Sequence, residues 1–469
     1  MAKYNLLAEQ IKEQIGRGVW MDGEKLPSLR KQAEQSGYSL MTVLHAYQML
    51  ESQGVIRSLE RSGYIVTLPS KPSSKQLVQT TDAVSVNDFV FEVLQASRDT
   101  RMFSLGFAYP DPSLYPRQHL NKSLISAAKQ ISLTSALDNL PPGNPELRQL
   151  IAKRYAARGV NISPDEIVIT AGALEALSLS LQACTKPGDW VVLESPTFYG
   201  AMQAMQRLGL KAITVTVSPT SGIDLAALER AFQSHPVKAC WLMSSFQNPL
   251  GYCLTDDKKR SIAALLQKYS VALIEDDVYA ELYADSPPLP VKAFMPQGNS
   301  MLCASFSKSL VAGFRIGWVA AGTRALDVQK QQVMSTLATS APIQLSLVDY
   351  LSTKNYELHL KQLRKQLRQR KHDMYLFWQE LLADVARVHM HEGGYFLWVE
   401  CATHVDSMDI YREALRLNIT IAPGKLFCLT DEFNHCFRIN GSFELNQPRR
   451  HQLRKLAEFI RQCSRKSAS

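Results

Sequence analysis

The hydrophobic residues of positions 1–68 recur at the spacing of short helices and then of a hairpin. Apolar side chains three or four positions apart form two helical stripes. These stripes consist of Leu6, Leu7, Ile11 and Ile15 in a first helix and of Val43, Ala46, Tyr47 and Leu50 in a third. Ser28 and Ser39 stand where they would cap a second helix over 29–36 and the third helix. The segments 55–57 and 64–66 flank a turn at 61–63, which predicts a β-hairpin.

A different pattern begins after residue 68. The stretch 68–75 is rich in Pro, Ser and Lys, so we take about 68–87 as a linker, and 69–100 as linker and lead-in to a second domain over 101–469. In that domain short β-rich runs alternate with amphipathic helical stretches, which predicts an α/β fold with a mostly parallel sheet. The β-rich runs are Ile167–Thr170, Trp190–Leu193, Ala239–Met243, Val271–Ile274 and Met301–Ser305, and Glu146–Arg158 and Asp256–Tyr269 are among the helical stretches.

Composition narrows the class of protein. A chain of 469 residues with 46% hydrophobic and 20% charged residues is expected to fold into two or three domains. Its N-terminus is polar and no apolar run reaches the roughly 18 residues of a membrane span, so we expect a cytoplasmic protein without a membrane partner. The eight cysteines are scattered without a Cys-x-x-Cys pair, which favours reduced thiols and no metal site.

The N-terminal helices and hairpin have the outline of a winged helix-turn-helix with one polar face. With the third helix's apolar stripe turned inward, its other side chains would face double-stranded DNA, as would Arg30 after the cap of the second helix. The predicted DNA-binding residues are Ser28, Arg30, Ser39, Met41, Thr42, His45, Arg61 and Gly63. Two alternatives stay open: His45 and Gln48 are simply a solvated helix face, or the whole unit serves only protein contacts.

Residues 4–66 resemble the GntR-type winged helix. The positions in register with that family are Gly18, Gly23, Leu26-Pro27-Ser28, Arg30, Ala33, Ser39, Thr42-Val43, Leu50-Glu51, Gly54 and Gly63. The family often has an arginine directly after the capping serine, whereas this chain has Leu40. The resemblance therefore implies a DNA-binding unit whose contacts are fewer than usual or different.

Lys308 stands in a setting suited to covalent chemistry. It follows the apolar run 301–304, lies among small residues and precedes Arg315 by seven positions. A desolvated lysine beside a cation has a lowered pKa and becomes nucleophilic, as the formation of a Schiff base with an aldehyde requires. Ser305, Ser307 and Arg315 supply the hydroxyl and guanidinium donors that a phosphate needs. If the aldehyde is that of pyridoxal 5'-phosphate, further groups are required, and each can be looked for in the sequence.

The other groups that this cofactor requires can be found along the chain. Asp276 ends an apolar run and would keep the pyridine nitrogen protonated. Tyr279 and Asn248 would hydrogen-bond the phenolic oxygen of the ring. Gly172 and Ala173 open a helix directly after a strand, where backbone N–H groups favour phosphate.

Two residues have alternative readings. Phe198 would stack on the cofactor ring, or it is a core aromatic and Tyr199 takes that place. Arg438 would bind the α-carboxylate of an amino acid bidentately, or it belongs to a structural ion pair.

Residues 100–469 resemble the fold-type I aminotransferases in chain order and in these local motifs. The resemblance implies a mostly parallel sheet with a smaller C-terminal α+β subdomain, Lys308 as the catalytic Schiff-base lysine, and a homodimer with its sites at the interface. Relatives commonly carry a tyrosine that reaches the phosphate bound by the neighbouring subunit. Leu140 occupies that position here, so that contact is missing.

The combination of both domains resembles the MocR subgroup of GntR-family transcription regulators. This resemblance implies a DNA-binding regulator that carries pyridoxal 5'-phosphate on Lys308 and senses an amino acid or the cofactor itself. The alternative is an active aminotransferase of the 2-aminoadipate, aromatic or branched-chain type, with or without a regulatory role.

Overall fold

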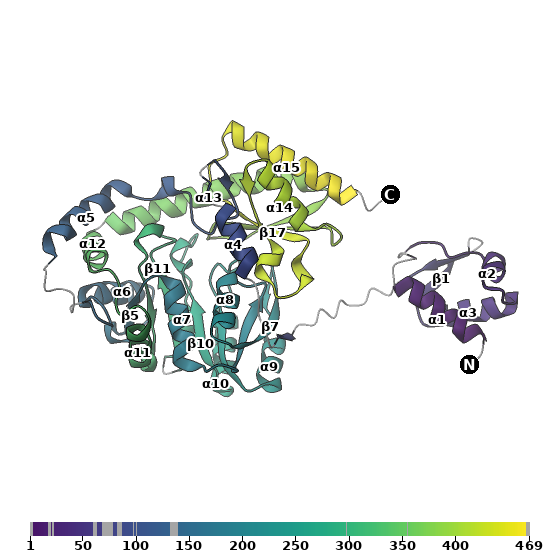
Figure 1. Cartoon of the computed structure of the whole chain (residues 1–469), viewed down its shortest axis with the longest axis horizontal. Coiled ribbons are helices and arrows are strands. Elements are labelled where there is room, and N and C mark those ends of the chain that lie inside the picture. The colour runs from purple at the N-terminus through teal and green to yellow at the C-terminus, as the bar shows by residue number, and fades with distance from the viewer. Residues whose placement is uncertain are drawn as a thin grey trace. The chain divides into compact units, whose positions relative to one another are not determined.

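The computed structural model describes residues 3–16, 20, 23–59, 63–67, 78–81, 87–96, 98–99, 101–131, 139–296, 298–353 and 355–465. The chain divides into two compact units, Met1–Lys75 and Gln76–Ser469 (Figure 1). Arg61, which the sequence predicts to contact DNA, lies outside the described residues, as does the linker stretch 68–77.

The first unit contains three helices followed by a two-stranded antiparallel hairpin, as its hydrophobic pattern predicts. Its elements are α1 (Lys3–Gly16), α2 (Leu29–Ser36), α3 (Leu40–Ser52), β1 (Ile56–Leu59) and β2 (Gly63–Val66). The side chain of Ser28 caps α2 by accepting the N–H of Lys31, and that of Ser39 caps α3 by accepting the N–H of Thr42. In the hairpin, Ile56 lies opposite Val66.

The stripe on α3 is the centre of this unit's core. Val43, Ala46, Tyr47 and Leu50 are completely buried, and the Tyr47 hydroxyl donates to the carbonyl of Pro27 at 2.9 Å. Complete burial of these side chains removes apolar area from water and fixes α3 against α1. Leu6, which belongs to the expected stripe on α1, is 44% exposed.

The second unit is built on one large sheet, which lies between layers of helices in Figure 1. The strand order is β3-β7-β6-β9-β10-β11-β12-β5, with β8 paired to β7. The strands β7, β6, β9, β10 and β11, which are neighbours in this order, run parallel, whereas β12 is antiparallel to both of its neighbours. The strands are β3 (Val78–Thr81), β5 (Ile167–Thr170), β6 (Trp190–Ser195), β7 (Lys211–Ser218), β8 (Gly222–Ile223), β9 (Val237–Leu242), β10 (Ala272–Asp276), β11 (Ser300–Ser305) and β12 (Gly317–Ala320).

Helices cover this sheet and extend beyond its edges. They are α4 (Asn87–Ala96), α5 (Arg117–Gln130), α6 (Pro145–Ala157), α7 (Ala173–Cys184), α8 (Tyr199–Arg207), α9 (Leu225–Ser234), α10 (Asp256–Lys268), α11 (Ala325–Ser335) and α12 (Ala341–Leu351). The central strands are buried on both faces, which is why their sequences are continuous hydrophobic runs rather than alternating ones.

Part of the stretch expected to be a linker belongs to this unit. Val78–Thr81 is an edge strand that pairs antiparallel with β7, with Val78 opposite Val215. The helix α4 follows, and its Val90 and Val93 are buried in the core. A four-residue edge strand has no hydrophobic pattern of its own, because pairing with a distant strand supplies its stability.

A smaller subdomain of α+β type completes the second unit. Its sheet has the order β13-β14-β17-β16. Its elements are β13 (Ala386–Met390), β14 (Phe396–Cys401), β16 (Ala422–Pro423), β17 (Cys436–Asn440), α13 (Asn355–Leu382), α14 (Ser407–Arg416) and α15 (Gln447–Arg465). A short parallel pair, β4 (Phe103–Ser104) with β15 (Ile419–Thr420), ties the beginning of the unit to this subdomain.

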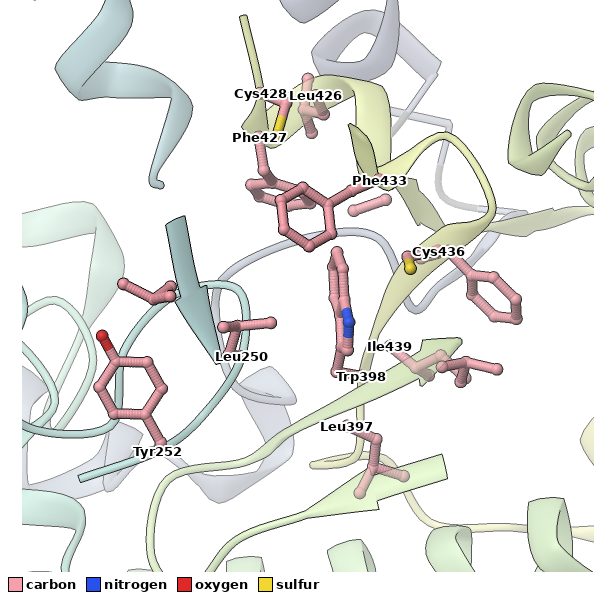
Figure 2. Close-up of a cluster of buried hydrophobic side chains, with 14 of the residues drawn as sticks. Leu250, Tyr252, Leu397, Trp398, Leu426, Phe427, Cys428, Phe433, Cys436 and Ile439 are labelled. Carbon is pink, nitrogen blue, oxygen red and sulfur yellow. The ribbon is translucent and has the colours of Figure 1, made fainter. Parts of the chain in front are cut away.

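Buried aromatic side chains join the subdomain to the large sheet. The Trp398 ring makes edge contacts with Phe427 and Phe433, each with centroids 6.2 Å apart, and Leu250 from the loop after β9 lies beside this cluster (Figure 2). This packing fixes β14 and β17 relative to the carboxyl ends of the parallel strands. Within the ranges described above, no helix is both long and apolar enough to cross a membrane, and no group of three His, Cys, Asp or Glu side chains is arranged to hold a metal ion.

Candidate functional site

A cavity with about 590 Å³ of empty space, part of it open to solvent, lies where the parallel strands of the second unit end. The strands β10 and β11 end at Asp276 and Ser305, and both side chains line it. Carboxyl ends of parallel strands meet at one edge of a sheet, which is where α/β proteins bind ligands. The predicted cofactor residues that line the cavity are Ala173, Phe198, Asn248, Asp276, Tyr279, Ser305, Ser307, Lys308 and Arg315.

Lys308 reaches into this cavity from the turn after β11. Its Nζ donates to the carbonyl of Ala108 and lies 3.6 Å from the centroid of the Tyr109 ring and 5.7 Å from that of Tyr279. Burial and, to a smaller extent, the positive charge of Arg438 lower the pKa of the Lys308 amine to about 7, against the opposing effect of the charge of Asp276. A large fraction of this amine is therefore neutral and nucleophilic at neutral pH.

Asp276 is a buried carboxylate, only 2% exposed. The N–H of Val278 lies 3.4 Å from its Oδ1, and burial raises the pKa of Asp276 to about 7. A group with an N–H donor inside the cavity would favour the charged form of this carboxylate. The adjacent Asp277 is occupied elsewhere, because Arg158 pairs with it at 3.3 Å.

Gly172, Ser307 and Arg315 form a small polar cradle. Gly172 has φ +93°, and a Cβ added there would lie 2.6 Å from Nη2 of Arg315, so the guanidinium rests directly on the backbone that leads into α7. The N–H of Ser307 donates to Oγ of Ser305 at 3.4 Å. The hydroxyl of Ser307 is buried and has no hydrogen-bond partner among the described residues. A cradle of guanidinium, hydroxyls and a helix N-terminus has the donors that a phosphate needs.

Arg438 lies on β17 beside the cavity and is 1% exposed. Its Nη1 donates to Oδ1 of Asn248 and its Nη2 to the carbonyl of Gly106, both at 2.5 Å, while its Nε is buried and has no partner in the described part of the chain. The guanidinium lies 4.4 Å from the centroid of the Phe396 ring, and burial lowers its pKa. No carboxylate in the described part of the chain pairs with it, so the structural ion pair considered as an alternative is not seen.

The sequence reasoning missed the segment Phe107, Ala108 and Tyr109, whose three residues line the cavity. The side-chain amide of Asn440 donates to the carbonyls of Phe107 at 2.9 Å and of Tyr109 at 2.6 Å. The hydroxyl of Tyr395 donates to the carbonyl of Ala108 at 3.0 Å. These contacts join positions about 290 to 330 residues apart, so neither periodicity nor local spacing indicates them.

The residues present fit pyridoxal 5'-phosphate. The unpartnered Ser307 hydroxyl and the Gly172–Arg315 contact suit its phosphate, the buried Asp276 suits a pyridine N–H, and Tyr279 and Asn248 flank the same cavity. When bound, this group supplies an aldehyde and an electron-accepting ring. The chain would then offer the Lys308 amine, hold the phosphate and exclude water with the rings of Phe198, Tyr109 and Tyr279.

The first unit presents its predicted DNA-binding residues largely on the outside. Arg30 and His45 are exposed, Met41 is 58% exposed and Gly63 has φ +93° with nothing close to it. Thr42 is only partly exposed because its hydroxyl lies 2.8 Å from that of Ser39. Leu40, at the position where the resemblance suggests arginine, is 46% exposed, so an apolar side chain stands on this face.

Two family models match the chain. The model "Aminotransferase class I and II" matches residues 112–447, and the model "Bacterial regulatory proteins, gntR family" matches residues 3–66. Among solved structures, the multiple substrate aminotransferase of Thermococcus profundus is 25% identical, with a TM-score of 0.74 over 80% of this chain and 95% of that one. The kynurenine aminotransferase of Pyrococcus horikoshii is 26% identical, also with a TM-score of 0.74, over 80% and 94%.

Whole-length relatives share both parts. The HTH-type transcriptional regulator YdcR of Escherichia coli K12 is 51% identical over 98% of this chain and 100% of its own length. The HTH-type transcriptional regulator YjiR of the same organism is 33% identical over 98% and 99%. Together with the two models, these matches show that the chain belongs to the MocR-type branch of the GntR-family transcriptional regulators, in which a GntR helix-turn-helix domain is fused to an aminotransferase class I and II domain.

Proposed function

We propose that this chain is a transcription regulator that binds double-stranded DNA through residues 1–68 and pyridoxal 5'-phosphate through Lys308. Membership of the GntR family supports the first part, and the aminotransferase domain supports the second. The observation that carries the proposal is one cavity that brings together Lys308, Asp276 and Arg315 with eight other polar or aromatic residues.

The ligand that regulates this protein is an amino acid or the cofactor itself. Arg438 supports an amino acid, because its buried guanidinium retains an unpartnered Nε beside the cavity. A carboxylate is the natural partner of such a group. The ligand would act by binding one arrangement of the large domain more tightly than another, and so shifting the population of DNA-binding states.

We further propose a cytoplasmic homodimer. Apolar side chains near the cavity rim and on α11 support a second copy of this chain as the partner. Leu174 is 48% exposed, and on or just after α11 Leu326, Met334 and Leu337 are 60%, 72% and 54% exposed. Apolar groups exposed together on one helix are typical of a protein interface. A two-fold dimer would present two DNA-binding units to two half-sites of an operator.

A spectrum tests the cofactor and the ligand together. Purified full-length protein supplied with pyridoxal 5'-phosphate is expected to develop a visible absorbance band, and the band is expected to change with one or a few of the twenty amino acids. Failure of the protein to develop a band with excess cofactor would refute the cofactor proposal. A band that no amino acid changes would favour the cofactor itself as the effector.

An active aminotransferase is the second candidate. The lowered pKa of the Lys308 amine favours it, because a neutral lysine can also move a proton at the substrate. The two activities are separated by turnover: protein, amino acid and 2-oxo acid are incubated and product amino acid is measured. Sustained turnover with several donors would make catalysis the primary activity.

The third reading, a winged helix that contacts only proteins, is tested by gel shift. Duplexes from around the chain's own gene are offered at low salt, where phosphate contacts are strongest. Binding of at least one such duplex supports the regulator. Absence of binding to every duplex would favour a role in protein contacts.

A further inference from the structure

The excess positive charge of this chain is concentrated on one helix of the second unit. The net charge is +9, and residues 1–75 contain ten Lys and Arg against seven Asp and Glu, a net of +3. The single helix α15 contains six Lys and Arg and one Glu, a net of +5. The GntR unit therefore does not account for most of the positive charge, whereas α15 carries nearly all of the excess of the second unit.

The basic groups of α15 gather on its first half. Arg449, Arg450, Arg454 and Lys455, which we call the basic face of α15, occupy its first three turns. Arg454 and Lys455 are exposed, and Arg449 and Arg450 are partly exposed. No carboxylate of the described residues lies within ion-pair distance of these four groups. By contrast, Arg461 near the end of the helix pairs with Asp384 at 3.2 Å.

Three of the four cations are held in place by aromatic rings. The guanidinium of Arg449 lies 4.7 Å from the centroid of Phe103. Those of Arg450 and Arg454 lie 5.0 and 5.6 Å from the centroid of Phe377 on α13. Stacking fixes a guanidinium while leaving N–H donors at its edge, so less side-chain entropy is lost when an anion binds.

Backbone contacts restrict the same side chains further. Nη1 of Arg449 donates to the carbonyl of Glu444 at 2.7 Å, and Nε of Arg450 donates to the carbonyl of Leu445 at 3.2 Å. Both acceptors belong to the turn that leads into α15, and the positive end of the helix dipole lies there as well. In Figure 1, α15 runs along the outside of the small subdomain. Because Arg454 and Lys455 are exposed, a large partner can reach them.

We propose that the basic face of α15 is a second, sequence-independent contact surface for the phosphate backbone of duplex DNA. The proposal rests on the proposed function, because DNA bound by the first unit is present at high effective concentration for the second unit of the same chain. Four cations without an ion-pair partner in the described part of the chain, three of them preorganised, lie within residues 449–455, about 9 Å of helix, and match a polyanion with one charge per about 1.7 Å. Its contribution is affinity and register on DNA that flanks the operator, without base recognition.

Salt dependence of DNA binding by the full-length protein tests this proposal. The test variant is Arg449→Gln, Arg454→Gln and Lys455→Gln together. The matched control, Lys122→Gln, Lys361→Gln and Lys365→Gln, removes three exposed charges from other helices of the same unit. Binding to a fluorescent duplex of arbitrary sequence, long enough to extend well beyond one operator, is measured by anisotropy over a range of KCl concentrations.

The slope of log affinity against log salt concentration reports how many phosphate contacts each variant makes. Wild type and control are expected to share one slope, and the test variant is expected to have a slope smaller by about 2 to 3, because each lost phosphate contact removes about 0.9. Equal slopes in test variant and control, with wild type binding DNA, would overturn this proposal alone and leave the proposed function intact. If wild type binds no duplex, the proposed function and this surface fall together.

Two further measurements test whether a changed slope has another cause. The cofactor absorbance band of the test variant is expected to match that of wild type, since the three side chains are outside the cavity. A cooperative thermal transition shows that the variant is folded, because Arg449→Gln also removes contacts with Phe103 and with the carbonyl of Glu444. Vesicles of phosphatidylglycerol are the second polyanion offered. If wild type binds the vesicles, the test variant does not, and both have the same salt slope on DNA, the basic face of α15 binds a lipid and the DNA proposal is overturned.

Discussion

The amine of Lys308 lies over the ring of Tyr109, with Nζ 3.6 Å from the ring centroid, and the same tyrosine contacts Arg315 through its hydroxyl, 3.4 Å from Nη1. One side chain therefore touches both the lysine proposed to carry the cofactor and the arginine proposed to hold its phosphate. Leu140 stands where the resemblance suggests a phosphate-binding tyrosine, so the hydroxyl of Tyr109 brings a phenol to Arg315 from another part of the chain.

Tyr109→Phe is expected to weaken retention of pyridoxal 5'-phosphate about 5-fold, the equivalent of one hydrogen bond of about 1 kcal/mol. Tyr109→Leu, which also removes the ring above Lys308, is expected to weaken it more. Cofactor loss is measured by dialysis and the visible absorbance that remains. Tyr375→Phe on α13 is the control and should behave as wild type. Equal retention by Tyr109→Phe and wild type would show that the hydroxyl contributes nothing to the phosphate site.

Lys308→Ala is expected to abolish the visible absorbance band and the attachment of cofactor after borohydride reduction. The reason is that no other lysine lines the described cavity, so no second amine can take its place. The mass of the peptide that contains position 308 reports attachment directly. Lys361→Ala, an exposed lysine on α13, should keep both signals. A band that persists in Lys308→Ala would refute this assignment.

The rate of cofactor attachment is expected to rise with pH and to reach half of its plateau near pH 7. Only the neutral amine attacks an aldehyde, and burial lowers the pKa of Lys308 from 10.5 to about 7. Because the positive charge of Arg438 contributes to that lowering, Arg438→Met should raise the pKa and move the midpoint to higher pH. The growth of absorbance after mixing gives the rate. A wild-type midpoint near that of an ordinary lysine would contradict the burial of this amine.

Arg438→Ala is expected to keep the absorbance band but to lose its response to amino acids. Loss of a buried guanidinium leaves a bound carboxylate unpaired, so the apparent affinity should fall by at least about 30-fold. Asn248, which accepts from Nη1 of Arg438, also loses a fixed donor. Arg416→Ala, 79% exposed on α14, is the matched control. An unchanged response would remove Arg438 from carboxylate binding.

Local signals in the sequence were sufficient to predict many of the helices and strands. The predicted second helix and the first strand of the large domain coincide with α2 (Leu29–Ser36) and β5 (Ile167–Thr170), because a capping serine and a continuous apolar run define them locally. The edge strand β3 and the reversed strand β12 could not be predicted in this way. Both are specified by pairing with distant strands, β7 in one case and β5 and β11 in the other.

The residues of the candidate site also differ in whether local sequence signals could identify them. Asp276, Ser305 and Lys308 could be proposed because the ends of parallel strands are known positions for ligands. Tyr109 could not, because its place over Lys308 depends on Asn440 holding its carbonyl across more than 300 residues of chain. A hydrophobic pattern contains no information about such a contact. The roles given to these residues remain predictions until the variants above are measured.

Arg30→Ala is expected to weaken binding to an operator by about 1–3 kcal/mol if Arg30 contacts a base edge. Arg30 is exposed at the start of α2, two positions after the capping Ser28, so its loss should leave the fold of the unit unchanged. Duplexes from around the chain's own gene and a scrambled duplex are titrated by anisotropy, with Lys12→Ala on α1 as the control. A loss confined to one duplex indicates base readout. An equal loss on all duplexes, with a salt slope lower by about 1, makes Arg30 a phosphate contact instead. No loss on any duplex would remove α2 from the DNA-binding surface and leave α3 as the remaining candidate.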